Sequence, residues 1–236
     1  MKLNKNDSTE STTKAVVGAA GLGAGILIVE DHPTMREGLI RVIERESDLR
    51  VAGQADSAVR ALEFLASSEP SLVLLDISLG NDNGIELIKD IKIRHPQLAV
   101  LVHSMHEDSV YAGRALRAGA KGYVAKSEPP ENLLKAIREV LRGEIYLNEV
   151  LTKQILHTLA ADEHQKGASP FGVLSDREFE VFEMMGKGFV TKEIASMLHL
   201  SQKTVQAHRD HIREKMGLKD AASLLRFSIR WTEAQG

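Results

Sequence analysis

The run Leu72–Asp76 constrains the fold of this chain more than any other stretch. Four branched apolar residues follow one another and stop at the carboxylate of Asp76. An uninterrupted apolar run of this length predicts a strand buried on both faces, inside a parallel sheet that helices cover. Ligands of such sheets gather just outside the carboxyl ends of the strands, which is where Asp76 stands.

Similar apolar runs alternate with helix-like segments from Ile26 onward. Strands are predicted at 26–29, 49–52, 72–75, 98–102 and 122–125. Each is followed by a segment with helical spacing; Ser57 is expected to cap the second helix, and the fifth is predicted at 131–142. Five such units predict an α/β domain with a parallel sheet and helices on both faces.

Polar side chains follow four of the five predicted strands. Glu30 and Asp31 end the first strand, Asp76 the third, Ser104 the fourth and Lys126 the fifth. Because these strand ends share one edge of the sheet, three carboxylates would repel one another there unless a cation neutralised them. A hard, oxygen-liganded ion such as Mg²⁺ suits them, and a lysine and a hydroxyl suit phosphoryl oxygens. The pattern indicates metal-assisted phosphoryl chemistry on a carboxylate.

The composition narrows the function classes. With 236 residues, 43% hydrophobic and 27% charged, the chain has the make-up of an ordinary soluble protein of one or two domains. The absence of cysteine excludes disulfides, thiolate zinc sites and cysteine nucleophiles, and it fits a cytoplasmic location. A formal net charge of -3 excludes a chain that is basic throughout, but a local basic patch for nucleic acid is still compatible with it.

Residues 1–25 are interpreted as a flexible leader. The uncharged stretch behind Lys14 is superficially like a signal peptide, but it carries four glycines between residues 18 and 25. It is therefore a poor helix, and it is too short to span a bilayer, so we favour a leader over an export signal and expect no membrane contact. The glycines at 21–25 precede a strand instead of following one, which argues against a dinucleotide loop.

Residues 26–146 resemble the receiver domain of two-component response regulators. The motifs ILIVEDHP (26–33), LVLLDISLG (72–80), LVHSM (101–105) and GYVAKSEPPENL (122–133) stand in the order and spacing of that family. The resemblance implies a five-stranded flavodoxin-like fold with strand order 2-1-3-4-5. It also implies that Asp76 accepts a phosphoryl group from a histidine kinase.

The same resemblance assigns the metal ligands. Asp31 would bind Mg²⁺ directly, Glu30 mostly through water and Ser78 through its backbone carbonyl, beside Asp76 itself. Glu30 stands where the family often has aspartate, and its longer side chain fits the water-mediated contact. Gly80 stands where proline is frequent, which is expected to loosen the loop after Asp76 without removing a ligand.

The resemblance also assigns a switch. Ser104 and Lys126 would bind the phosphoryl group. Tyr123 would be the aromatic side chain that changes position together with Ser104 on activation.

A linker is predicted at 147–173. It begins with a helix at 149–161 whose apolar stripe comprises Val150, Leu151, Ile155, Leu156 and Leu159. We favour packing of this stripe against one of the domains over a dimer contact. The glycines, serine and proline between 162 and 172 predict a flexible joint.

The remaining residues, 174–236, are predicted to be all helical. Ser175 and Glu178 form a capping-box pattern, Thr191 is expected to cap a short helix, and Ser201 or Gln202 opens the next. A turn at 199–201 joins these two short helices into a helix-turn-helix, whose second helix enters the major groove by its amino-terminal part. That segment carries five basic and two acidic residues between 201 and 219. Composition alone leaves a protein-interaction module open.

The sequence LSDREFEVFEMMGKGFVTKEIASMLHLSQKTVQAHRDHIREKMGL (174–218) resembles the LuxR-type DNA-binding domain of NarL/FixJ-type regulators along its whole length. By position in this family, the base-facing residues would be Lys203, Gln206, Ala207 and Asp210. The phosphate-facing residues would be Lys192, Thr204, Arg209 and Arg213. Basic residues are common in the family where Gln206 and Asp210 stand, which predicts a different site or weaker binding, and Val190-Thr191 replaces the usual Ser-Asn.

These inferences predict a transcription regulator, not an enzyme. Phosphorylation of Asp76 would control the binding of double-stranded DNA by dimerising the protein or by releasing its second domain. One alternative is a phosphorylation-independent regulator that uses the receiver only for dimerisation. Another is an aspartyl-phosphate phosphatase or phosphotransferase of the haloacid-dehalogenase type, but Ser78 stands where such enzymes carry a second acid.

Overall fold

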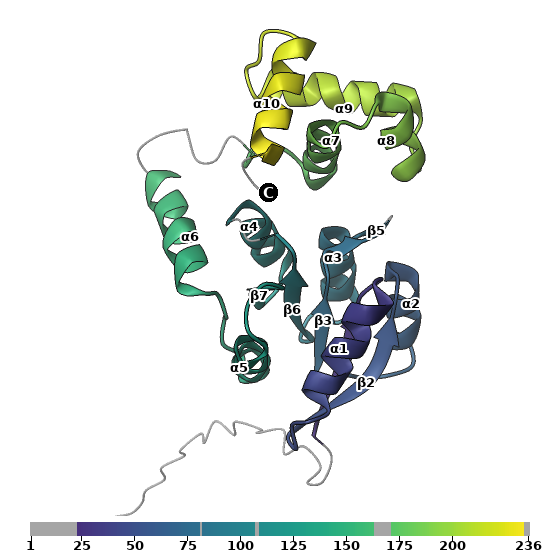
Figure 1. The fold of residues 1–236 in the computed structure, drawn as a ribbon, viewed down its shortest axis with the longest axis vertical. Coiled ribbons are helices and arrows are strands. Elements are labelled where there is room, and N and C mark those ends of the chain that lie inside the picture. The colour runs from purple at the N-terminus through teal and green to yellow at the C-terminus, as the bar shows by residue number, and fades with distance from the viewer. Residues whose placement is uncertain (1–22, 81, 107–108, 163–170, 234–236) are drawn as a thin grey trace, which may run out of the picture.

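A five-stranded parallel sheet forms the first part of the chain (Figure 1). The computed structural model describes residues 23–80, 82–106, 109–162 and 171–233. The strands of the sheet are β1 (Ala24–Val29), β2 (Leu49–Ala55), β3 (Leu72–Leu75), β6 (Ala99–Ser104) and β7 (Gly122–Ala125). Their spatial order is β2-β1-β3-β6-β7, which confirms the predicted order 2-1-3-4-5 for the five parallel strands.

Helices cover both faces of this sheet (Figure 1). They are α1 (Pro33–Ile43), α2 (Ala58–Leu65), α3 (Gly84–Arg94), α4 (Ser109–Ala118) and α5 (Pro130–Leu141). Successive residues of a strand point to opposite faces. Val73 and Leu75 therefore join the core under α2, α3 and α4, whereas Leu72 and Leu74 join the core under α1 and α5. Because both faces are buried, the β3 sequence is apolar without interruption.

The sequence did not predict a short hairpin after β3. It pairs β4 (Ser78–Leu79) with β5 (Asp82–Asn83) in antiparallel fashion. Asn83 then caps α3, because its side-chain oxygen accepts hydrogen bonds from two backbone amides of the first turn. Ser57 occupies the N-cap position of α2 as predicted, but its side chain makes no capping hydrogen bond. The Ser57 hydroxyl donates to Asp56, and the Ala58 amide donates to the Asp82 carboxylate at 2.7 Å instead.

The linker helix is α6 (Glu149–Asp162). Its apolar residues face two ways: Leu151 is buried and Ile155 packs against the core, whereas Val150 and Leu156 are 62% and 60% exposed. Packing on the receiver thus accounts for one half of the predicted stripe. Most of the joint predicted at 162–172, and Leu159's side chain, lie outside what the structure describes.

Four helices form the last part of the chain (Figure 1): α7 (Asp176–Gly186), α8 (Thr191–Met197), α9 (Gln202–Lys215) and α10 (Ala221–Glu233). The capping box of Ser175 and Glu178 is present, and the Ser201 hydroxyl caps α9. Thr191 is the first residue of α8 and not its cap. Its hydroxyl accepts a hydrogen bond from Arg209, while Glu193 accepts the Val190 amide.

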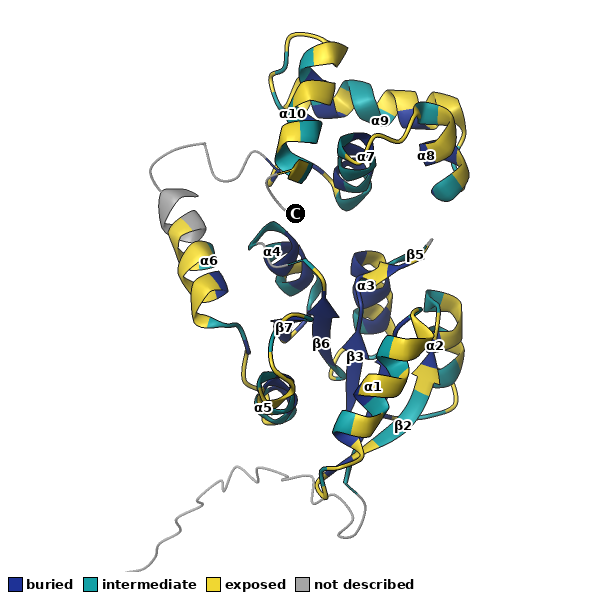
Figure 2. Ribbon diagram, in the orientation of Figure 1, coloured by how far each residue is buried: buried dark blue, intermediate teal, exposed yellow. Residues whose placement is uncertain are grey.

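The central sheet and the C-terminal helices differ in how far their residues are buried (Figure 2). Strands β1, β3, β6 and β7 are almost wholly buried and β2 is only partly buried, whereas long stretches of α9 and α10 are exposed. Within the described residues, no helix combines the length and apolar character that a membrane span requires.

Candidate functional site

The strand ends bring four of the predicted residues into one cluster, called the acidic cluster below. Lys126 directly follows β7 and its side chain is 4% exposed; its Nζ donates to Asp76 Oδ2 and to Glu30 Oε2, each at 2.7 Å. Asp76 and Glu30 are themselves only 3% and 1% exposed. Asp31 is the more accessible acid of the cluster, with its side chain 25% exposed. The parallel register places β1 beside β3, so the acids that end these strands meet at one edge.

His32 extends this group of acids. Its Nδ1 lies 2.9 Å from Asp31 Oδ1 and 3.3 Å from Glu30 Oε1. Ligand atoms of Glu30, Asp31, His32 and Asp76 all lie within 4.8 Å of one another. The sequence reasoning overlooked His32, although its place directly after the two acids was a signal.

The charges of the acidic cluster do not balance. Three carboxylates face one ammonium group, which leaves two negative charges for a divalent cation to neutralise. Burial lowers the pKa of Lys126, but the hydrogen bonds to Asp76 and Glu30 outweigh burial, and the net pKa is raised. Lys126 is therefore a fixed positive charge beside the Asp76 carboxylate. Oxygen donors with excess negative charge are the ligand set that Mg²⁺ prefers, so the residues present fit this ion.

The loop after Asp76 explains the glycine at position 80. Gly80 has a φ of +56°, and a Cβ there would lie 3.4 Å from the Asp31 carboxylate. Proline is fixed near a φ of −65° and cannot adopt this conformation. The backbone amide of Ser78 donates to Asp76 Oδ1 at 2.9 Å. The loop thus orients the Asp76 carboxylate through its own backbone.

The two predicted switch residues meet at His106. Ser104 is fully buried at the end of β6, and its hydroxyl oxygen accepts the His106 amide at 3.2 Å. Tyr123 is fully buried on β7, and its hydroxyl donates to the His106 carbonyl at 2.8 Å. His106 also contacts the loop after Asp76, since its Nε2 lies 3.4 Å from Ser78 Oγ. Sequence reasoning missed His106, because an isolated histidine in a loop carries no pattern.

The predicted DNA-facing residues lie on the outer side of α9 and at the start of α8. Lys192, Lys203, Thr204, Gln206 and Ala207 are exposed, while Val205 and Ile212 are buried in the helical core. Exposure of one face and burial of the other is the arrangement that a recognition helix needs.

The remaining three predicted residues are tied to neighbours within the helical domain. Arg209 donates to Thr191 Oγ1 at 2.6 Å. Arg213 lies 3.7 Å from Asp210, and Gln206 approaches Asp210 at 3.5 Å. The negative charge of Asp210 is therefore partly offset by Arg213.

Family comparisons match both parts of the chain. The response regulator receiver domain family matches residues 26–138. The LuxR family of bacterial regulatory proteins matches residues 172–228. These two regions contain the acidic cluster and the helix-turn-helix, respectively.

Known relatives align with both parts of the chain. Oxygen regulatory protein NreC of Staphylococcus aureus is 34% identical over 209 residues, which cover 87% of this chain and 96% of that protein. RcsB of Salmonella enterica serovar Typhimurium, solved bound to promoter DNA with a beryllofluoride phosphomimetic, is 25% identical. It aligns over 87% of this chain and 98% of its own, with a TM-score of 0.64.

A LuxR-family response regulator from Aurantimonas sp. SI85-9A1 is 33% identical over 58% of this chain and 99% of that chain, with a TM-score of 0.56. The family matches, the length of the NreC alignment and the fold agree with one another. The chain therefore belongs to the response regulators of the NarL/FixJ type, in which a receiver domain is joined to a LuxR-type DNA-binding domain.

Proposed function

We propose that this response regulator takes a phosphoryl group from a histidine kinase onto Asp76, and that this modification controls DNA binding and transcription. The observation that carries the proposal is the pair of 2.7 Å contacts from Lys126 to Asp76 and Glu30, beside the carboxylate of Asp31. A buried acid with a fixed cation on one side and surplus negative charge on the other is equipped for phosphoryl transfer.

In the transfer step, an Asp76 carboxylate oxygen forms a bond to phosphorus while the bond from phosphorus to the kinase imidazole nitrogen breaks. Lys126 already contacts Asp76 Oδ2, so its ammonium group needs only a small shift to bind a phosphoryl oxygen. Glu30, Asp31, Asp76 and the Ser78 backbone carbonyl would hold Mg²⁺. The ion would neutralise charge on the transferring group.

The structure suggests how the modified site would be sensed. Ser104 Oγ now accepts the amide of His106. Reorientation of the Ser104 hydroxyl toward a phosphoryl oxygen would break that bond and free the segment that the Tyr123 hydroxyl also holds. Movement of Tyr123 would then accompany movement of Ser104, as expected for a two-state switch.

For the output, we propose that two phosphorylated chains pair on DNA and place their α9 helices in successive major grooves, about one helical turn apart. Lys203, Gln206, Ala207 and Asp210 would face bases. Lys192, Thr204, Arg209 and Arg213 would contact phosphates and make binding salt-dependent.

A test incubates the protein with a small phosphodonor and Mg²⁺ and compares the wild type with Asp76→Asn. Asp90→Asn is the matched control, because Asp90 is an exposed carboxylate on α3 outside the acidic cluster. We expect one adduct by intact mass in the wild type and in Asp90→Asn, and none in Asp76→Asn. An adduct that survives Asp76→Asn would refute the assignment of the acceptor.

The second half of the test treats the same proteins with beryllofluoride. Light scattering should show an increase in mass toward a dimer, and DNA affinity should rise, in the wild type and in Asp90→Asn only. DNA binding that ignores beryllofluoride would instead favour a regulator that works without phosphorylation.

A further inference from the structure

The two domains contact each other through helix α7, whose outer side packs on the receiver. Arg114 of α4 is 5% exposed and makes the central contact. Its guanidinium donates to Asp176 Oδ1 at 2.5 Å and to the backbone carbonyls of Phe171 and Leu174 at 2.7 and 3.0 Å. It also lies over the Phe179 ring, 4.4 Å from the ring centre. A planar cation enclosed by an acid, two carbonyls and a ring is a specific anchor.

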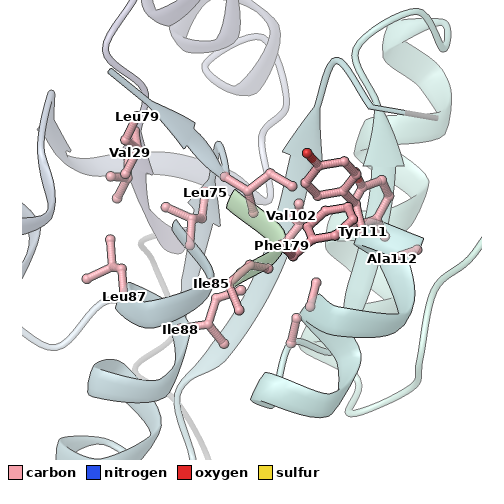
Figure 3. Close-up of a cluster of buried hydrophobic side chains, with 14 of the residues drawn as sticks. Val29, Leu75, Leu79, Ile85, Leu87, Ile88, Val102, Tyr111, Ala112 and Phe179 are labelled. Atoms are coloured by element: carbon pink, nitrogen blue, oxygen red, sulfur yellow. The ribbon is translucent and has the colours of Figure 1, made fainter. Parts of the chain in front are cut away.

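Further contacts surround this anchor. Lys89 of α3 donates to Asp176 Oδ2 at 2.6 Å. The Tyr111 ring packs edge-on against Phe179 at 5.2 Å, and the Tyr111 hydroxyl bonds to Glu183. Figure 3 shows Tyr111 and Phe179 in one apolar cluster with Val102 of the central sheet. The receiver core thus continues into the DNA-binding domain.

Helix α7 separates the receiver from the recognition helix (Figure 1). On one side α7 meets α3 and α4; on another it packs against α9, and Lys215 of α9 donates to Glu178 at 2.6 Å. The base-facing positions Lys203, Gln206 and Ala207 are exposed while the domains are docked. Among the described residues, the hydrogen bonds and ion pairs of the predicted DNA-facing side chains stay within the DNA-binding domain.

From this geometry we infer that the protein binds DNA with its two domains still docked through α4 and α7. The docked receiver does not cover the recognition helix, so domain release is not needed to expose it. Phosphorylation would then act by pairing two docked chains, and not by freeing the second domain. This inference rests on the proposed function. It decides between the two effects of phosphorylation that the sequence left open, dimerisation and release of the DNA-binding domain.

A reversible cross-link tests the inference, because the natural chain has no cysteine. Arg117→Cys and Gly172→Cys place two thiols in the same groove between α4 and the segment that precedes α7, and both positions are exposed. A bifunctional methanethiosulfonate would fix the docked arrangement and a reductant would release it. Intact mass identifies the intramolecular product. The single-cysteine variants, capped with a monofunctional reagent, control for modification itself.

The probe is a duplex selected from a random-sequence pool by the uncross-linked, beryllofluoride-treated double variant. Fluorescence anisotropy should give Kd values for cross-linked and reduced protein that agree within about threefold. A tenfold or greater loss of affinity on cross-linking, recovered on reduction, would overturn the inference and leave the proposed function intact. Failure of the reduced protein to select any duplex would overturn both this inference and the proposed function.

Discussion

Acidification from pH 7 to pH 4 should destabilise the receiver domain through His103. This residue lies on β6 directly before Ser104 and is 6% exposed. Its Nδ1 has no hydrogen-bond partner in the described part of the chain. Burial, with a smaller contribution from the positive charge of Lys126, lowers the pKa of His103 to about 4. The folded protein therefore holds this imidazole neutral where an unfolded chain would protonate it.

The sign follows from proton binding. Above about pH 6.5 the imidazole is neutral in both states, and His103 adds no pH dependence. Below that pH the unfolded chain binds a proton that the folded protein rejects until about pH 4. The free energy of unfolding should consequently fall with falling pH. Linkage gives a loss from this residue of about 2 kcal/mol at pH 5 and about 3 kcal/mol at pH 4.

Urea unfolding at pH 7 and pH 5 measures this loss when the wild type is compared with His103→Leu. Carboxylates titrate in both proteins, so the difference between their pH dependences isolates the imidazole. All three tyrosines lie between residues 111 and 146, whereas the single tryptophan is Trp231, so near-ultraviolet circular dichroism follows each domain separately. An equal pH dependence in the two proteins, or an imidazole that titrates near pH 6.5 by NMR, would refute the reasoning.

Three further changes test other parts of the structure. Gly80→Pro should weaken Mg²⁺ binding, measured by isothermal titration calorimetry, and should slow phosphorylation, because proline cannot adopt the φ of +56°. Gly80→Asn, the control, should retain both Mg²⁺ binding and the rate of phosphorylation. Ser175→Ala removes the cap of α7 and should lower the free energy of unfolding of the DNA-binding domain by about 1 kcal/mol. Urea titrations followed at Trp231 measure this change, and a change below the error of the method would contradict the capping role. Arg114→Met should uncouple the domains and split thermal unfolding into separate tyrosine and tryptophan transitions, and a single shared transition would argue against the anchor.

The sequence was most informative where local pattern and three-dimensional position coincide. Leu72–Leu75 is apolar throughout because its alternate residues enter two different cores. Four consecutive residues are therefore enough to predict that this strand is buried on both faces. The acids follow directly, since a parallel register brings the ends of β1 and β3 together. The predicted Ser175 capping box and the predicted start of α9 at Ser201 or Gln202 are equally local, and the structure contains both.

Short elements with no period of their own escaped prediction. The β4–β5 hairpin has two residues in each strand, too few for alternation to be recognised. Its Asp82 takes over the capping contact predicted for Ser57, from 24 residues away in the chain. Similarly, Thr191 was predicted to be a cap from its residue type, but its hydroxyl oxygen accepts a hydrogen bond from Arg209 of α9. Residue type alone therefore identified which side chains could cap, and tertiary contacts decided which did.

The domain interface shows the same limit at larger scale. On α4, Arg114 reads in sequence as a surface cation, yet its acceptors lie 57 to 62 residues further along the chain. Tyr111 stands one turn before it, so both side chains project from the same face of the helix. Helix α4 begins a few residues after Ser104, and His106 between them touches Ser104, Tyr123, Ser78 and the Glu183 side of α7. A change at the acidic cluster can therefore reach α7 through one short segment. The recognition helix α9 stays exposed meanwhile, because the surface that contacts the receiver and the surface that reads DNA lie on different sides of the same small domain.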